Sequence, residues 1–308
     1  VQIMRYSIFF KKKPFLNKIY YILRSIILGK NLTNGPEMVI NSLIPELKRR
    51  KIIFNINPLF NEINQNVIIL SDHKVLKKLI LLKKIRKFKL FAGPNISILP
   101  TDYSKLLLSP GIDKVLVPSE WVKKLYIEKS KNLKDKIYVW PSAIDVSKFN
   151  NKIKIKKKYD FLVYIKFFKD KNLLDQCLAY LNKHYQIKII YYGRYKINFF
   201  YSLLAQSKYS IFFSESESQG IMYFESWAAN VSSLVFNKKK VYKKGLSTLA
   251  IPCPYLDERY NGLAFVDFAS FKKKIKILVK QNKKPRKWLI NNYSMKQQAS
   301  KILAQFKN

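Results

Sequence analysis

Short apolar runs of strand length alternate along the chain with amphipathic stretches that have the period of a helix. In the first half the apolar runs fall at 67–70, 89–92, 114–117 and 137–140, and helical patterns cover 38–50, 74–87 and a stretch from residue 120. A second series has apolar runs at 161–165, 187–192, 209–213 and 233–236, with helices expected from residue 173 and over 220–230. Strands that alternate with helices are typical of parallel sheets with helices on both faces. The sequence therefore predicts an α/β fold.

A basic linker separates the two series. Residues 150–158 are almost entirely lysine, isoleucine and asparagine, which is typical of an exposed connection. The similar series on either side predict two doubly wound, Rossmann-like domains at 1–150 and 151–286 that face each other across a cleft. Residues 287–308 should form a terminal region with one helix over 287–306. Ligands of doubly wound sheets bind beyond the carboxyl ends of the strands, so we expect the functional site in the cleft.

The net charge is unusual for a globular protein. Lysine and arginine number 59 against 19 aspartate and glutamate residues, so the net charge is +40, and only eight of the 59 are arginine. Two interpretations stay open: codon usage in an AT-rich genome, and selection for a basic surface. In both cases the chain attracts polyanions, a class that includes nucleic acid, acidic lipid and nucleotide phosphates.

A basic nucleic-acid-binding protein is one alternative that this charge suggests. Lysine greatly outnumbers arginine and is spread along the chain, and no helix-turn-helix, zinc-finger or RNA-binding signature is present. We therefore expect no specific nucleic-acid partner. The lysine clusters at 238–240, 243–244, 272–274 and 283–284 are interpreted as solvated faces or as a peripheral contact with an anionic membrane.

The remaining composition excludes several other classes. Two cysteines (Cys177 and Cys253) and two histidines (His73 and His184) cannot supply a disulfide framework or a structural zinc site. The longest apolar stretches are far shorter than the roughly 20 residues that span a bilayer. The first residues also lack the pattern of a signal peptide. A cytoplasmic location is therefore expected.

One segment does not follow the lysine bias. Residues 197–237 contain a single basic residue, Lys208, where the chain average would give about eight, and they contain three carboxylates, Glu215, Glu217 and Glu225. The pattern is a strand, a polar turn over 214–220, and then a helix. A helix start offers unpaired N–H groups and a positive dipole, which suit phosphates or sugar hydroxyls. Acids near a helix start are also favourable without a ligand, so the spacing of Glu217 and Glu225 leaves both interpretations open.

The stretch from Glu217 to Glu225 resembles the Glu-x7-Glu signature of group 1 (family 4-like) retaining glycosyltransferases with the GT-B fold, and Gly220 falls at the inner glycine of that signature. Other segments resemble the family in the same order. These are Gly35-Pro36 before an amphipathic helix, Val117–Trp121, Trp140–Val146 with Phe149, and Phe161–Ile165 followed by Lys166, Lys169 and Lys171. The resemblance covers roughly residues 35–262 and continues to the terminal helix. It implies that the first domain binds the acceptor, that the second binds the donor, and that the terminal helix returns toward the first.

The resemblance implies a role for each matching residue. Glu225 would bind the ribose of a nucleotide-sugar donor, and Glu217 would contact the transferred sugar. Backbone groups around Gly220, with Gln219 and Ile221, would approach the sugar and its diphosphate. The catalytic basic pair would be Lys166, where the family usually has arginine, with either Lys169 or Lys171; Glu215 would cap the helix or substitute for Glu217, and Gly35, Gly93 and Asn95 would lie at the acceptor side of the cleft.

The same resemblance implies the reaction. A hexosyl-type, metal-independent transferase would move a sugar to a glycan, lipid-linked or surface-polymer acceptor, with retention of anomeric configuration and no cofactor beyond the nucleotide-sugar co-substrate. The absence of an Asp-x-Asp motif agrees with an enzyme that needs no metal. A catalytically inactive GT-B-like scaffold is the other alternative, because the region before Gly35 is irregular and its first strand is hard to place.

Overall fold

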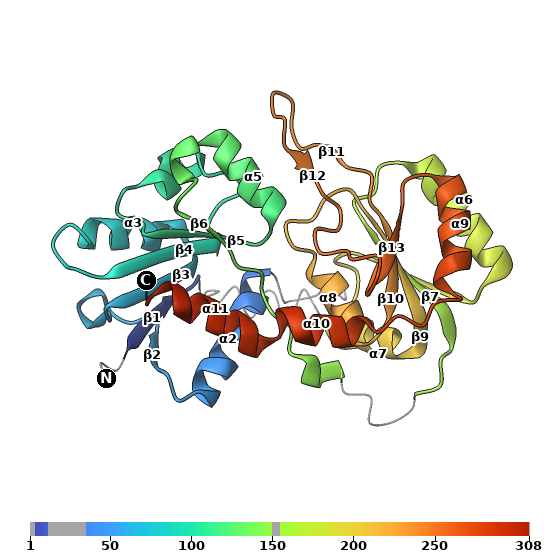
Figure 1. Cartoon of the computed structure of the whole chain (residues 1–308), viewed down its shortest axis with the longest axis horizontal. Coiled ribbons are helices and arrows are strands. Elements are labelled where there is room, and N and C mark those ends of the chain that lie inside the picture. Colours follow the sequence, from blue (N-terminus) through green and yellow to red (C-terminus); the bar gives the residue numbers. More distant parts are fainter. Residues whose placement is uncertain (1–3, 12–34, 150–154, 308) are drawn as a thin grey trace.

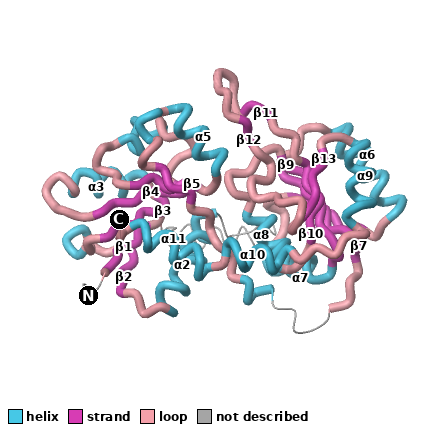
Figure 2. Tube along the Cα trace, viewed as in Figure 1, coloured by secondary structure: helices cyan, strands magenta, loops and turns pink. Residues whose placement is uncertain are grey.

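The computed structural model describes residues 4–11, 35–149 and 155–307. These residues form two α/β lobes that lie side by side, with the amino-terminal lobe on the left of Figure 1 and the second lobe on the right. Each lobe has a sheet at its centre and helices on both sides of it, which Figure 2 shows by secondary structure. The expected domain boundary between residues 150 and 151 lies outside the described residues.

The sheet of the first lobe is parallel, and its described strands follow the order β2-β1-β3-β4-β5-β6. Its strands are β1 (Arg5–Phe9), β2 (Ile53–Ile56), β3 (Asn66–Ser71), β4 (Lys89–Asn95), β5 (Lys114–Val117) and β6 (Ile137–Val139). The flanking helices are α2 (Gly35–Arg49), α3 (His73–Leu82), the short α4 (Asp102–Lys105) and α5 (Glu120–Lys129). The four strands expected from apolar runs are confirmed as β3 to β6.

The second lobe has a parallel sheet in the order β13-β10-β9-β7-β8. Its strands are β7 (Tyr159–Lys166), β8 (Ile187–Tyr191), β9 (Ser207–Ser214), β10 (Ser232–Phe236) and β13 (Gly262–Phe265). Its helices are α6 (Lys171–His184), α7 (Ile197–Gln206), α8 (Ile221–Ala228) and α9 (Phe268–Leu278). A small hairpin of β11 (Lys240–Val241) and β12 (Leu249–Ala250) extends from this lobe.

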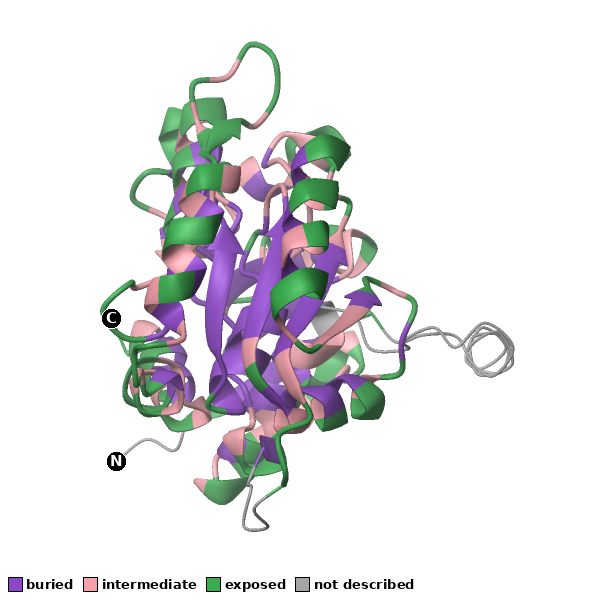
Figure 3. Ribbon diagram, turned by 90° about the vertical axis from the view of Figure 1, so that its right-hand side faces the viewer, coloured by how far each residue is buried: buried purple, intermediate pink, exposed green. Residues whose placement is uncertain are grey.

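Alternating side chains explain why these runs form central strands. In β9, Ile211 packs into the core beneath α6 and α9, while Phe212 faces the core that α7 and α8 cover. Such strands bury both faces and therefore read as continuous apolar runs. Figure 3 shows the buried strands in purple between helices whose outer faces are green.

The predicted terminal helix differs from the observed one. The chain forms two helices, α10 (Pro285–Tyr293) and α11 (Met295–Gln305), with a break at Ser294. The Ser294 side chain accepts from the Gln297 N–H and the Gln297 side chain accepts from the Ser294 N–H, which is a capping box that starts a new helix. Helix α11 lies against α2 in the first lobe (Figure 1), and Phe306 stacks on Phe91 there at 3.8 Å between ring centroids. The expected boundary at 286 falls inside α10.

Side chains from both lobes hold them together. The Gln219 amide exchanges two hydrogen bonds with the backbone of Ser142, at 2.7 and 2.8 Å. The Trp121 indole N–H donates to the carbonyl of Glu217 at 2.9 Å. These contacts bring the start of α5 and the end of β6 in the first lobe against the loop before α8 in the second.

No helix among the described residues is long and apolar enough to cross a membrane. The part of the chain that the structure describes also contains no cluster of three or more histidine, cysteine, aspartate or glutamate side chains suited to hold a metal ion.

Candidate active site

The loop between β9 and α8, which carries several of the candidate residues, follows the carboxyl end of a strand. Strand β9 is the central strand of the second sheet and ends at Ser214, and the loop that follows carries Glu217 toward the first lobe. The β7 and β9 strands pair in parallel register, with Lys166 opposite Ser214. Parallel pairing therefore brings the two strand ends together, because the carboxyl ends of parallel strands meet at one edge of the sheet.

Glu217 is held from both sides at this edge. Its side chain is buried, with 7% of the residue exposed. One carboxylate oxygen forms an ion pair with the Lys166 ammonium at 2.8 Å, and the other accepts a hydrogen bond from the Ser214 hydroxyl at 2.8 Å. Lys166 also lies over the Tyr192 ring, with the ammonium 4.6 Å from its centroid. Two of the residues that the resemblance assigns to the reaction, Lys166 and Glu217, are therefore in direct contact.

Glu225 belongs to the helix that follows the loop of Glu217. It is on α8, is 4% exposed, and accepts a hydrogen bond from the Tyr201 hydroxyl at 2.9 Å. Burial raises the pKa of Glu225 to about 7, although the Tyr201 hydrogen bond and the positive charge of Lys148 lower it. Burial also raises the pKa of Tyr201, which keeps that hydroxyl protonated as a donor.

Gly220 is required by the turn that starts α8. Its φ is +80°, in the left-handed region that favours glycine. A Cβ atom at this position would also lie 2.6 Å from Cε2 of Tyr223, which is a fully buried side chain. The Tyr223 hydroxyl donates to the Pro252 carbonyl at 3.0 Å, so the ring cannot easily move away. A side chain at position 220 would therefore strain the turn and displace the buried Tyr223 ring.

A cavity of about 200 Å³ between the lobes joins these residues. Of the residues singled out in the sequence, seven line it: Asn95, Lys166, Glu217, Gln219, Gly220, Ile221 and Glu225. Gly35 begins α2, and Met38 and Val39 of that helix line the same cavity. Among the described residues, Gly93, Glu215, Lys169 and Lys171 are not in its lining.

Three of these four lie around the loop after β7. Glu215 forms an ion pair with Lys240 at 3.0 Å and accepts from the Lys169 N–H at 3.2 Å, so its carboxylate joins that loop to the β11–β12 hairpin. The residues Lys169 and Lys171 are both exposed. The choice of either one as the partner of Lys166 stays a prediction.

Gly93 and Asn95 have different roles on the first lobe. Gly93 has a φ of +124°, and a Cβ there would collide with the Leu116 carbonyl, so this glycine allows β4 and β5 to approach closely. Asn95 lines the cavity, and its buried side-chain N–H group has no hydrogen-bond partner among the described residues. Asn95 also lines an adjoining cavity of about 450 Å³ whose walls include Trp121 and Tyr126. An unpaired donor at this point suits a hydroxylated ligand.

The sequence reasoning missed a wall of tyrosines. Tyr164, Tyr192 and Tyr195 line the cavity, and Tyr201 holds Glu225. The expected strand over 187–192 includes Tyr192 and so predicts a core side chain, which is wrong, because the residue is 48% exposed. No local pattern marks these tyrosines, since strands β7 and β8 and helix α7 bring them together.

Comparison with solved structures finds the same two-lobed architecture in glycosyltransferases. The chain is similar to a glycosyltransferase from Rickettsia africae, with a TM-score of 0.61 and 14% identity over 99% of this chain and 98% of that one. The galactosyltransferase of the lipopolysaccharide outer core, WaaB, has a TM-score of 0.61 and 11% identity over 98% and 99% of the two chains. Sucrose-phosphate synthase from Thermosynechococcus elongatus has a TM-score of 0.56 and 8% identity over 99% and 98%.

These similarities establish the GT-B fold that the sequence predicts. At such low identities they establish the fold alone. No protein-family profile matches the chain, and a search of curated proteins finds no significant similarity.

Proposed function

We propose that this chain is a glycosyltransferase that moves a hexosyl group from a nucleotide-sugar donor to a glycan, lipid-linked or surface-polymer acceptor, with retention of anomeric configuration. The observation that carries the proposal is the pair Glu217 and Glu225, both buried in the wall of the cavity between the lobes, with Lys166 beside the first. The GT-B architecture shared with known glycosyltransferases supports it.

The donor would lie against the second lobe. Glu225 offers a carboxylate for the ribose hydroxyls, and Tyr201 fixes the orientation of that carboxylate. The backbone N–H groups after Gly220 would approach the diphosphate, because a helix start favours negative charge. Side chains of the tyrosine wall would cover the apolar parts of the donor.

Lys166 would act on the leaving group. The acceptor hydroxyl oxygen bonds to the anomeric carbon as the bond from that carbon to the diphosphate oxygen breaks on the same face. The acceptor proton passes to the departing diphosphate, so no protein base is needed. Negative charge grows on the diphosphate in this step, and a fixed ammonium without metal assistance stabilises it. Glu217 holds the ammonium in place at 2.8 Å and would meet the sugar hydroxyls.

The acceptor would enter from the first lobe. The adjoining cavity of about 450 Å³ opens beside Asn95, and its size is within the range of ligand sites. An acceptor at an anionic membrane agrees with the high positive charge of the chain. One neighbour in fold, WaaB, carries the name of a lipopolysaccharide galactosyltransferase, which supports a glycan acceptor for this chain.

Nucleotide-dependent thermal stabilisation tests the proposal. UDP, GDP, ADP and CMP are compared on the wild type and on Glu225→Ala, with the shift caused by each nucleotide as the measured quantity. A nucleotide at 100 times its dissociation constant should stabilise the wild type by about 2.7 kcal/mol. One diphosphate should act selectively, and Glu225→Ala should abolish its effect.

Glu215→Ala is the matched control, because this carboxylate is only two residues from Glu217 but lies outside the cavity lining. It should keep the nucleotide shift. Equal weak shifts from every polyanion, unchanged in Glu225→Ala, would mean that only the net charge is detected. Selective binding without release of sugar from any nucleotide sugar would instead identify an inactive scaffold.

A further inference from the structure

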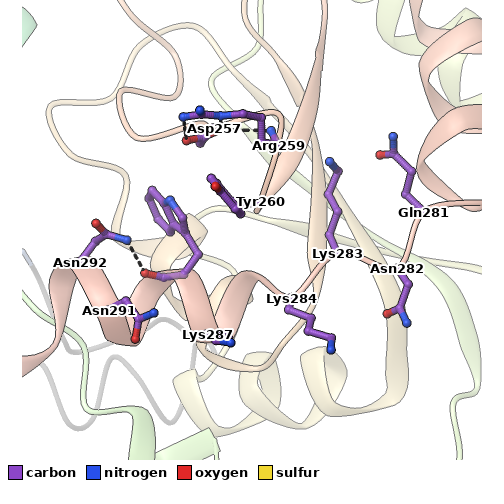
Figure 4. A pocket seen from close by; sticks show the side chains of 11 residues that line it. Asp257, Arg259, Tyr260, Gln281, Asn282, Lys283, Lys284, Lys287, Asn291 and Asn292 are labelled. Atoms are coloured by element: carbon purple, nitrogen blue, oxygen red, sulfur yellow. Dashed lines mark hydrogen bonds and ion pairs between the residues drawn. The ribbon is translucent and has the colours of Figure 1, made fainter.

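A third cavity, larger than the two described above, lies outside the cleft between the lobes. Its volume is about 810 Å³, and it is bounded by the 257–260 loop of the second lobe and by the segment from Gln281 through α10 (Figure 4). This volume is within the range of ligand sites. The side chains drawn in Figure 4 fall into three chemical groups. The first contains the charged side chains, which are basic except for Asp257, the second contains amides, and the third contains aromatic rings.

The cations leave a surplus of positive charge in this cavity. Asp257 is paired with Arg259 at 2.9 Å, so these two charges balance. Lys283 donates to the carbonyl of Glu258, which is a neutral partner. Lys284 and Lys287 are exposed and form no ion pair within the part of the chain that the structure describes. The ammonium groups of Lys284 and Lys287, which have no acidic partner among the described residues, attract an anionic ligand.

Amides are unusually frequent in the same lining. The side chains of Gln281, Asn282 and Asn291 have no hydrogen bond to other described residues. Asn292 donates one N–H to the Trp288 carbonyl at 2.8 Å, which leaves its carbonyl oxygen as an acceptor. Each amide offers both donors and acceptors, so the set suits hydroxyl groups, which need both.

Two aromatic rings complete the surface. Tyr260 is 48% exposed, and the guanidinium of Arg259 lies 5.2 Å from its ring centroid. Trp288 is partly exposed, and its ring is held by edge contact with the buried Trp227 at 5.4 Å. An exposed ring with a polar rim, such as that of Tyr260, can pack against the C–H face of a sugar while its surroundings bind the hydroxyls.

We propose that this cavity binds a segment of an anionic glycan, a polyhydroxylated chain that carries carboxylate or phosphate groups. Lys284 and Lys287 bind the anionic groups, the four amides bind the hydroxyls, and Tyr260 packs against a sugar ring. Single-stranded nucleic acid fits less well, because it requires successive stacking platforms along a uniformly basic groove, and here an acid lies in the lining. The site does not depend on the transfer reaction proposed above.

Calorimetric titration at 0.15 M salt tests the site with three probes: hyaluronan hexasaccharide, oligogalacturonate hexamer and a phosphorylated mannan oligosaccharide. The variant Lys284→Gln/Lys287→Gln should lose about ten-fold in affinity for the glycan that binds best. The control variant Lys74→Gln/Lys77→Gln removes the same charge from exposed positions on α3 in the other lobe and should keep that affinity. Equal losses in the two variants would overturn the proposal.

Tyr260→Ala separates a glycan site from a patch of charge. It removes no formal charge, so it should weaken the glycan several-fold and leave the weaker binding of hexaglutamate unchanged. Hexaglutamate or a hexameric RNA that binds as tightly as the best glycan would overturn the proposal. The absence of binding by all three glycan probes would overturn it as well.

Discussion

At the scale of single residues, the most informative group is the carboxyl of Glu225. It is buried on α8 with one neutral donor, Tyr201, and the positive charge of Lys148 acts on it from a distance. Desolvation therefore exceeds the favourable contributions, and the pKa of Glu225 rises to about 7. A carboxylate kept in such surroundings costs stability, and a ligand that supplies hydrogen bonds to it recovers that cost.

The pH dependence of stability tests this account. The folded protein binds the Glu225 proton more tightly than the unfolded chain, so the group destabilises the fold as pH rises from about 4.5 to 7. Glu225→Gln removes this cost while keeping an acceptor for Tyr201. We expect the variant to exceed the wild type by ~3 kcal/mol in unfolding free energy at pH 8 and to match it near pH 4. Urea unfolding at the two pH values measures the difference.

A difference that is the same at both pH values would contradict the raised pKa. Glu215→Gln serves as the control, because the Glu215 carboxylate is paired with Lys240 and should not gain stability at pH 8 when it is replaced.

At the scale of elements, the β11–β12 hairpin of the second lobe contacts the first lobe, where the Glu128 side chain hydrogen-bonds to its backbone. Glu128 on α5 accepts from the backbone N–H groups of Ser247 and Thr248, the latter at 2.8 Å, and from the Thr248 hydroxyl. These bonds lower the pKa of Glu128 to about 2, the Thr248 hydroxyl having the largest effect. Tyr242 and Leu246 from the same hairpin pack on the core of the first lobe.

Glu128→Gln should loosen the hairpin. A neutral amide offers one acceptor oxygen in place of two charged ones, so the N–H groups of Ser247 and Thr248 should exchange with solvent about ten-fold faster. Hydrogen exchange followed by NMR measures this rate. In the wild type the protection is present above about pH 4.5 and should be lost as pH falls through about 2, because the folded pKa is depressed.

Glu120→Gln is the matched control at the other end of the same helix. It should leave both exchange rates unchanged. Unchanged protection in Glu128→Gln would show that apolar packing alone holds the hairpin.

At the scale of the whole molecule, Gln219 couples the lobes. Gln219 and Ser142 are both buried, with 5% and 1% of each residue exposed. The Gln219 amide and the Ser142 backbone form two hydrogen bonds with each other, although 77 residues separate them in the sequence. The resemblance assigns Gln219 to donor binding, but the structure shows its amide engaged in this contact at the edge of the cavity. The residue therefore connects the wall of the cavity to the segment that follows the first sheet.

Gln219→Ala should destabilise the chain and separate the unfolding of its lobes. Truncation leaves the buried N–H and carbonyl of Ser142 without partners, at a cost of about 2–4 kcal/mol. We expect scanning calorimetry to show two transitions in place of one. Gln206→Ala, which removes an exposed hydrogen bond within α7, should unfold as the wild type does. A single transition with an unchanged midpoint in Gln219→Ala would refute the coupling.

Much of the architecture can be read from local pattern. The apolar runs of β3, β5 and β7 predict the strands of the two lobes, because burial of both strand faces leaves a short apolar run in the sequence. The Glu-x7-Glu spacing points to the loop before α8. The Ser294 capping box was also readable, although one long helix was expected. Strands β1 and β2 were missed, since the edge strand β2 is partly exposed and β1 carries the buried polar Ser7.

The sequence alone thus determined the α/β class, the loop that carries Glu217 and the helix that carries Glu225. Only the tertiary structure decided that Lys166 contacts Glu217, that Tyr201 holds Glu225, and that Gln219 binds Ser142. The reason is physical. The periodicity of apolar residues within an element indicates which of its faces is buried, and this pattern lies within the element's own residues. A hydrogen-bond partner depends on strand register and on how the two lobes meet, and neither leaves a trace within the few residues on either side of the group.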